Sequence, residues 1–446
     1  MRDICIIGCG IVGSTLAYEL SAYDLDVLVL EKEMDIALGA SRANYAVIHA
    51  GYDPAPGTMM AKYTVNSAKR INELSSRLGF SFHQCGSLLI SRNEAEDKLI
   101  IERYHRGIEN GVSNLELWDK EKCLSCEGNL SGDVRMALYA AESGVVNPWD
   151  YVVAFSQVAL REGVDFYLDH EVLDIIKMPD HYVIETNKGK IECRYIINAA
   201  GVDSAEIHNM VSDEEVSLAI QKASFYLFNN DNKNLSRHII FTCPDSENRG
   251  IIAAPTASGH YLVGENCELM RDKYCTKKSL SFEAVINQSR AILPGINVDS
   301  QYRTFVGERL STDVYDDFVI GFADDRFFDC AAIRSPGLSA APAMAKDVVE
   351  QVCSKMNAVK KEDWDGSLHK SKLLKHYPDE LAKDAEMDED LVLRILKRCE
   401  TVTSEEIVWA IESGLRVSAL DWVRERKGHK RGRCHGGLCN DGSCEE

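Results

Sequence analysis

The sequence predicts an α/β fold that opens with a βαβ unit of the nucleotide-binding kind. An apolar run of strand length, residues 3–7, leads directly into a glycine-rich turn at residues 8–13. A helix-favouring segment at 14–20 and a second apolar run at 27–30 follow. This succession of strand, turn, helix and strand is the context in which glycine spacing becomes informative.

The G-x-G-x-x-G spacing of the first turn predicts a dinucleotide site. Gly8 permits a tight turn, Gly10 lets backbone amides approach a pyrophosphate, and Gly13 lets the helix pack closely on the strand. The helix N-terminus offers unpaired N–H groups to that pyrophosphate. Glu31 ends the second apolar run, where a carboxylate can accept hydrogen bonds from a ribose diol. The alternative is an ordinary βαβ turn in which glycine only allows close packing.

Size and composition limit the class of protein. A chain of 446 residues predicts two or three domains. Its 45% hydrophobic and 27% charged residues include no apolar stretch long enough to span a bilayer. The first strand follows Met1 almost at once, so we expect no signal or transit peptide and a cytoplasmic location. The net charge of −20 disfavours nucleic acid as a partner.

Fifteen cysteines without a secretion signal indicate reduced thiols, metal ligands or buried small residues. Cys123 and Cys126 have the spacing of a redox or metal pair, but no second pair lies nearby. We favour the alternative, that both lie in one ordinary helix or turn.

Apolar periodicity places the remaining elements in order. Helices are predicted at residues 60–78, 99–111, 150–161, 282–293 and 340–355. Strands are predicted at 80–91 with a break at Gly86, at 164–168, 170–176, 195–198, 318–321 and 327–333, and in a hairpin at 182–195. Residues 216–263 have the composition of strands. A change of composition near 357 predicts a linker at 357–390 and a compact, cysteine-containing unit at 391–446.

Three small-residue segments are suited to contact with a cofactor. Residues 39–44 read as a polar loop, and the strand before residue 199 ends in Ala-Ala-Gly, as though a flat group lies against it. Residues 334–339 form a Pro-Gly turn that leads into a helix N-terminus, a second potential site for an anion or a carbonyl group.

Five ordered motifs resemble one group of flavoenzymes. They are the N-terminal turn and residues 41–44, 48–52, 198–201 and 335–338. Together they are similar to the D-amino-acid oxidase superfamily, in the branch of FAD-dependent glycerol-3-phosphate dehydrogenase and L-2-hydroxyglutarate oxidase. The resemblance implies FAD as the dinucleotide.

The resemblance also implies the domain organisation. A Rossmann-like FAD-binding domain would comprise residues 1–80, 145–215 and 300–356. It would be interleaved with an antiparallel-sheet substrate domain at 81–144 and 216–299. A small α-rich unit at 391–446 would follow the linker.

Residue roles follow from the same resemblance. It implies cofactor binding by Gly8, Gly10, Ile11, Val12, Gly13, Glu31, Lys32, Ser41, Arg42, Asn44, Val172, Ala200, Gly201, Gly337, Leu338 and Ser339. In the last three, amides at a helix N-terminus would stabilise the negative charge of a reduced flavin.

On the substrate side, His49 would lie near the reactive edge of the flavin, where a base can take a hydroxyl proton. The alternative for His49 is a hydrogen-bonded core histidine. Tyr52 is assigned to the substrate site, and Arg309 would clamp a carboxylate or phosphate through its guanidinium fork. A surface ion pair is the alternative for Arg309. Residues 221–226 depart from the family's Arg-Gly-Glu-Tyr-like strand, and Lys222 is either a second anion contact or a solvated lysine.

The C-terminal unit resembles the [2Fe-2S] domain of bacterioferritin-associated ferredoxin. The matching ligands are Cys399, Cys434 and Cys439, and a cluster needs four. The usual first cysteine is Lys397 here, so Cys444 would be the fourth ligand, or the unit is a structural remnant. A cluster would carry electrons from the flavin to a partner subunit or carrier.

Three functions remain open from the sequence. The first is an FAD-dependent dehydrogenase or oxidase of a small anionic hydroxy compound, of the glycerol 3-phosphate or 2-hydroxyacid type. The second is an amine or imino-acid dehydrogenase acting on a proline derivative or an opine, favoured by the altered strand at 221–226 and by the iron–sulfur-like C-terminal unit. The third is a non-catalytic flavin subunit of a complex.

Overall fold

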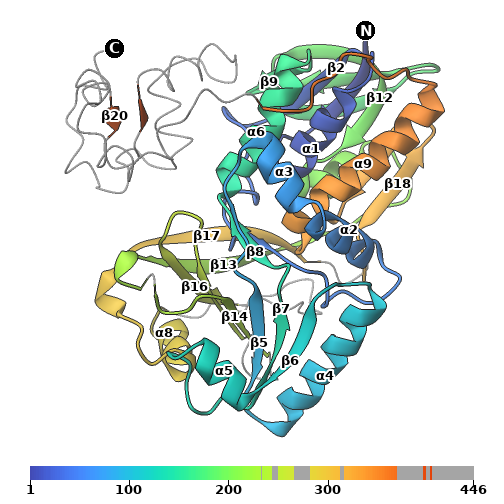
Figure 1. Cartoon of the computed structure of the whole chain (residues 1–446). Helices are drawn as coiled ribbons and strands as arrows, with labels where there is room; N and C mark the ends of the chain where they lie inside the picture. Colours follow the sequence, from blue (N-terminus) through green and yellow to red (C-terminus); the bar gives the residue numbers. More distant parts are fainter. Residues whose placement is uncertain are drawn as a thin grey trace.

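The computed structural model describes residues 1–232, 234–243, 250–265, 282–311 and 316–368, together with two short strands near the C-terminus. For Lys222 and Arg309, which lie in strands, it describes the backbone alone. The N-terminal strand belongs to a sheet covered by helices, and a second large sheet lies below it in the view of Figure 1.

Parallel strands form the centre of the first sheet. The order is β10-β11-β12-β1-β2-β9, and β19 pairs with the end of β12 and with β18. The strands are β1 (Arg2–Ile7), β2 (Val27–Glu31), β9 (Asp165–Leu168), β10 (Val172–Lys177), β11 (Tyr182–Thr186), β12 (Gly189–Asn198), β18 (Val319–Asp324) and β19 (Phe327–Ala331). The hairpin predicted at 182–195 is confirmed, with Tyr182 opposite Cys193.

Apolar residues on both faces of β1 explain why both faces of this sheet are buried. Ile4 and Ile6 are fully buried in a core shared with the helices of one face. Cys5 and Ile7 belong to the core on the opposite face. The helices of this part are α1 (Ile11–Leu20), α2 (Met59–Ala68), α3 (Ile71–Leu78), α6 (Pro148–Arg161), α7 (Ser204–Asn209) and α9 (Gly337–Met356). The single helix predicted at 60–78 is therefore two helices.

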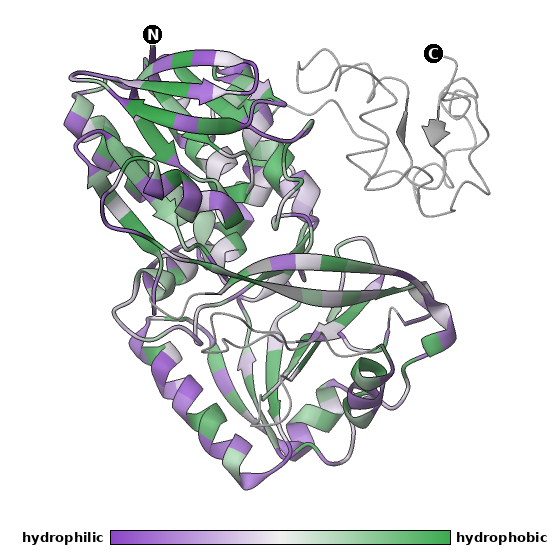
Figure 2. Ribbon diagram, turned by 180° about the vertical axis from the view of Figure 1, so that it is seen from behind, coloured by the Kyte–Doolittle hydropathy of each residue, from purple (hydrophilic) through white to green (hydrophobic). Residues whose placement is uncertain are grey.

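The second sheet is antiparallel except where β14 runs parallel to β5. Its order is β17-β13-β16-β15-β14-β5-β7-β6. The strands are β5 (Ser87–Ser91), β6 (Leu115–Asp119), β7 (Met136–Ala140), β13 (Ala219–Phe228), β14 (Ile239–Thr242), β15 (Ile251–Pro255), β16 (Tyr261–Glu265) and β17 (Gln301–Ser311). Figure 2 shows hydrophobic residues concentrated in the strands of both sheets.

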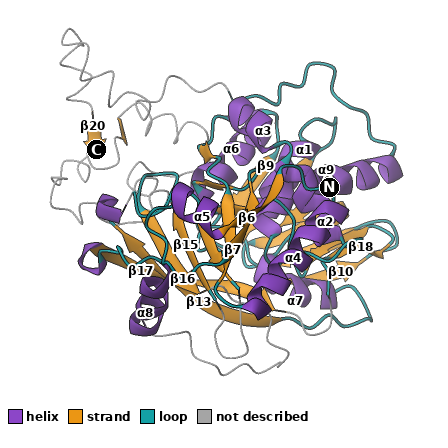
Figure 3. Cartoon of the chain, turned by 60° about the horizontal axis from the view of Figure 1, so that its bottom comes forward, coloured by secondary structure: helices purple, strands orange, loops and turns teal. Residues whose placement is uncertain are grey.

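Three helices accompany the second sheet: α4 (Glu94–Glu109), α5 (Lys120–Cys126) and α8 (Phe282–Ile292). The first packs near β5, β6 and β7, whereas α8 lies near β15 and β16, toward the other end of the sheet (Figures 1 and 3). Cys123 and Cys126 both lie in α5, as favoured from the sequence, and Cys123 is fully buried in the core. Burial raises the pKa of the Cys123 thiol to about 11.

Several short strands and 3₁₀ turns complete the fold. A three-stranded sheet joins β3 (Val47–Ile48), β8 (Gly144–Val146) and β4 (Phe82–His83). The 3₁₀ turns are η1 (Gly201–Asp203), η2 (Asn230–Asn232) and η3 (Val298–Ser300), and β20 (Ile395–Lys397) pairs with β21 (Val402–Thr403). Within the described part of the chain, no helix has the length and apolar character needed to cross a bilayer.

The first residues of the predicted linker, 357–368, pack against the first sheet's helices. The Trp364 ring makes an edge contact with Tyr18, lies under the guanidinium of Arg77, and donates from Nε1 to Ser21 Oγ (3.0 Å). The Tyr18 hydroxyl donates to the carbonyl of Gly366 (3.0 Å). Trp364 and Gly366, which make these contacts, lie in the segment that composition alone predicted to be a polar linker.

Candidate functional site

The turn between β1 and α1 has the backbone geometry that a pyrophosphate requires. Gly8 has a φ of 99°, and a Cβ there would lie 2.5 Å from the carbonyl oxygen of Ala199. A Cβ on Gly13 would overlap the carbonyl oxygen of Gly8. Gly10 is the N-cap of α1 and has no side chain to cover the first turn. No side chain of the turn itself therefore covers the helix N-terminus, whose Ile11 amide bonds to Ser41 Oγ.

Glu31, at the end of β2, is tied to the same turn. Its Oε2 accepts from the amide of Cys9 (2.7 Å) and its Oε1 from the amide of Glu33 (3.0 Å). Burial raises the pKa of this carboxyl. Next to it, Lys32 Nζ bonds to Asp203 Oδ2 (2.6 Å). The carboxylate is therefore fixed where the predicted ribose would lie.

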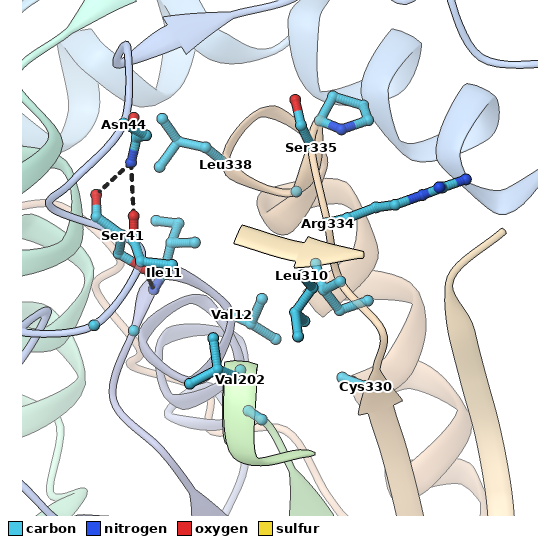
Figure 4. A pocket seen from close by; sticks show the side chains of 18 of the residues that line it. Ile11, Val12, Ser41, Asn44, Val202, Leu310, Cys330, Arg334, Ser335 and Leu338 are labelled. Atoms are coloured by element: carbon cyan, nitrogen blue, oxygen red, sulfur yellow. Dashed lines mark hydrogen bonds between the residues drawn. The ribbon is translucent and has the colours of Figure 1, made fainter. Parts of the chain in front are cut away.

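The loop at residues 38–46 closes over α1. Ser41 Oγ accepts from the Ile11 amide (2.9 Å), which ties the loop to the helix. Asn44 Nδ2 donates to the carbonyls of Ala40 and Ser41 (2.9 and 2.8 Å), and its Oδ1 accepts from the Ala46 amide (2.6 Å). Asn44 therefore organises the loop by internal bonds. Figure 4 shows Ser41 and Asn44 on one side of the pocket, with Leu338 nearby.

A second helix N-terminus meets the cavity at α9. The Ser335–Pro336 peptide is cis, and the Gly337 and Ser339 amides donate within the turn to the carbonyls of Arg334 and Pro336 (2.6 and 2.9 Å). Ser339 Oγ accepts from the backbone amide of His49 (2.9 Å). The start of α9 is thereby joined to the segment that carries His49.

These segments surround one cavity of about 840 Å³, within the range of small-molecule and cofactor sites. Most residues assigned from the sequence line it: Gly8, Gly10, Ile11, Val12, Glu31, Lys32, Ser41, Asn44, His49, Tyr52, Val172, Ala200, Gly201, Gly337, Leu338 and Ser339. Arg42 is exposed, although its neighbours Ser41 and Ala43 line the cavity. The cavity is long, reaching from Glu31 and Val172 to residues of the second sheet.

The far end of the cavity combines polar and apolar groups. His49 is half-buried, and its ring centroid lies 5.7 Å from that of Phe241 on β14. Tyr52 is buried, and burial raises the pKa of its hydroxyl. Arg103 and Arg106 of α4 also line this region. A histidine, an aromatic ring and two arginines that pair with Asp53 and Glu102 therefore line the part of the cavity away from Glu31.

Arg309 and Lys222 lie in the paired strands β17 and β13, where Arg309 is opposite Gln221 and Lys222 opposite Glu308. Glu308 and Leu310 line the cavity. The backbone of Arg309 is thus between two lining residues. The roles predicted for both cations remain predictions.

Arg334 and Phe241 are cavity residues that sequence reasoning missed. Arg334 Nη2 donates to the carbonyl of Asp316 (2.9 Å), while Nη1 is buried without a hydrogen-bond partner among the described residues. In Figure 4 its side chain extends away from Ser41 and Asn44. Its position directly before the Ser-Pro-Gly motif could have indicated that Arg334 lines the cavity. Nothing in the sequence around Phe241 distinguishes it from a core residue.

No group of three or more histidine, cysteine or acidic residues within the described ranges is arranged to hold a metal ion. The predicted cluster ligands Cys399, Cys434, Cys439 and Cys444 lie outside those ranges.

Comparisons with known proteins agree with this geometry. The family model "FAD dependent oxidoreductase" matches residues 3–351. Glycerol 3-phosphate dehydrogenase of Caloramator mitchellensis is 34% identical, covering 99% of this chain and 92% of that protein. Mitochondrial L-2-hydroxyglutarate dehydrogenase of Bos taurus is 29% identical, covering 60% and 61%. The structure of dithionite-reduced L-α-glycerophosphate oxidase from Mycoplasma pneumoniae with FAD bound is 27% identical, with a TM-score of 0.76 and coverage of 82% and 98%.

The resemblance predicted from the five motifs is therefore confirmed, and FAD is confirmed as the cofactor of this fold. Since the family model spans most of the sequence and the relative from Caloramator matches nearly all of it, the chain belongs to the FAD-dependent oxidoreductase family.

Proposed function

We propose that this oxidoreductase oxidises the secondary hydroxyl of glycerol 3-phosphate to a ketone, with hydride passing to FAD. The observation that carries the proposal is the match to a glycerol 3-phosphate dehydrogenase over almost the full length of both chains. The cavity supports it, because a histidine and several arginines meet at one end. A hydroxy substrate is favoured over the amine or imino-acid alternative, for which the similarity extends to the fold alone.

The described residues fit FAD. Gly10, which has no side chain beside the α1 N-terminus, and the close backbone packing at Gly8 and Gly13 suit the pyrophosphate, and fixed Glu31 suits the ribose. The amide of Leu338, which makes no backbone hydrogen bond among the described residues, would face a flavin oxygen. When bound, the flavin supplies the hydride acceptor.

His49 would accept the proton of the substrate hydroxyl as the hydride leaves the carbon that bears this hydroxyl. The Ser339 hydroxyl holds the His49 backbone, and the Phe241 ring lies beside the imidazole. Arg309 of β17 would bind the phosphate, so that the reacting C–H is held in place by a group remote from it. This division of roles needs no metal ligand.

Arg309→Ala is expected to raise the KM for glycerol 3-phosphate by about tenfold to a hundredfold while FAD stays bound. A hydrogen bond to a charged group contributes about 1.5–3 kcal/mol, and about 1.4 kcal/mol corresponds to a factor of ten. Steady-state kinetics with flavin absorbance as a check on occupancy measures both effects. Arg194→Ala removes a surface ion pair with Asp3 and is the matched control. An unchanged KM would exclude Arg309 as the anion site.

Anaerobic bleaching of the flavin tests the function itself. Glycerol 3-phosphate is expected to reduce the bound flavin fully, while L-2-hydroxyglutarate, proline and glycine leave it oxidised. Bleaching by an amino acid alone would contradict the proposal, and bleaching by no candidate would favour a non-catalytic flavin subunit.

The route of electrons away from the flavin is a further part of the proposal. The sequence resemblance of residues 391–446 to a [2Fe-2S] domain supports transfer to a partner subunit or carrier. A cytoplasmic location likewise remains a prediction from the sequence.

A further inference from the structure

We propose that Asn110, at the C-terminal end of α4, is a positioning residue that holds His49 in its reactive place. Asn110 is distant in sequence from the motifs that indicate the cofactor and the substrate. The inference rests on the proposed role of His49 as the base. The proposed contact joins α4, which packs on the second sheet, to residues 49–54, several of which line the cofactor cavity.

Asn110 grips the chain just after His49. Its Nδ2 donates to the carbonyls of Gly51 (3.0 Å) and Pro54 (2.9 Å), so a single amide spans the turn at residues 51–54. Its Oδ1 is buried and has no hydrogen-bond partner among the described residues. An unsatisfied buried acceptor destabilises the folded protein. An apolar side chain of the same size would fill this space without an unsatisfied acceptor. The two hydrogen bonds that Nδ2 donates are therefore the feature that requires an amide.

The neighbouring residues of α4 contact the same segment. Positions 103, 106, 107 and 110 follow the i, i+3, i+4, i+7 spacing of one helix face. Arg106 Nη1 donates to the carbonyl of Asp53 (2.8 Å), and Arg103 Nε bonds to the Asp53 carboxylate (2.9 Å). A Cβ on Gly107 would lie 2.8 Å from the Cβ of Tyr52, so glycine lets the helix approach this closely.

The other side of the segment is equally confined. Gly51 has a φ of 103°, and a Cβ there would lie 2.6 Å from a methyl group of Val65 in α2. At the preceding end, the His49 amide donates to Ser339 Oγ of α9. Only Ala50 separates His49 from Gly51. A shift of Gly51 acts on the chain two residues from His49, and a misplacement of about 1 Å can cost about a hundredfold in rate.

A purely structural role for Asn110 predicts a different pattern. Loss of packing would lower the stability of the protein and its FAD content together. Loss of positioning would instead slow the chemical step and loosen the amides of residues 49–54, while substrate and FAD still bind.

Asn110→Leu removes both donors at nearly constant volume. We expect flavin reduction at saturating glycerol 3-phosphate to slow at least tenfold, with KM within threefold and FAD content unchanged. Hydrogen–deuterium exchange of the peptide spanning residues 47–58 should accelerate. Glu109→Ala, on the exposed neighbour, is the control and should change neither quantity.

Unchanged reduction and unchanged exchange in Asn110→Leu would overturn the inference. If that variant does not fold, Asn110→Ala removes the same two donated bonds without adding bulk, and unaltered exchange of residues 47–58 in Asn110→Ala would overturn it equally. If the unaltered protein is not reduced by glycerol 3-phosphate, the proposed function fails. The exchange measurement then still tests the positioning of the segment, so the two failures are distinguishable.

Discussion

Replacement of His49 by alanine is expected to lower the rate of flavin reduction by about two to four orders of magnitude, the usual contribution of a positioned general base. The effect should fall on kcat, because His49 acts on the proton that leaves during hydride transfer. FAD should remain bound, since the Ser339 hydroxyl contacts the His49 backbone amide, which alanine keeps. Anaerobic stopped-flow absorbance at the flavin band measures the rate directly.

The control for this variant is His83→Ala, which changes an exposed histidine on β4. His83→Ala should leave the rate within twofold. A rate loss of less than about tenfold in His49→Ala would indicate a hydrogen-bonded structural histidine, the alternative that the sequence left open. Loss of FAD from His49→Ala would point to the same conclusion.

The cofactor half of the site was predictable because local sequence determines it. The turn at Gly8–Gly13 must lie between a strand and a helix that are adjacent in the chain, so spacing alone indicates its geometry. Glu31 ends the next strand, and the parallel pairing of β1 with β2 brings it back to the turn. The bonds that tie Glu31 to Cys9 and Ser41 to Ile11 join residues only 22 and 30 positions apart.

The substrate half was less predictable because it is assembled from distant segments. Phe241 lies beside His49 because β14 pairs with β5 in parallel, and no local sequence pattern indicates that pairing. The apolar periodicity of α4 predicted the helix, yet it could not show that Arg106 and Asn110 would face the His49 segment. The contacts of Trp364 with α1 and α3 were missed for the same reason, since the composition of 357–390 indicated only polarity.

Gly13→Ala is expected to abolish FAD binding. The added Cβ would overlap the carbonyl oxygen of Gly8, which is backbone and cannot rotate away. Either α1 must move from β1 or the turn must open, and both changes displace the amides that face the pyrophosphate. Protein purified with excess FAD should lack the flavin absorbance bands.

Gly39→Ala is the matched control, because no atom lies within 4 Å of a Cβ at that position although Gly39 also lines the cavity. It should retain FAD at the level of the unaltered protein. If Gly13→Ala bound FAD normally, the helix would have to shift without cost, which the buried contacts of α1 with α6 and α9 oppose. The comparison of the two variants therefore separates the close approach of α1 to β1 from a general intolerance of alanine near the cofactor.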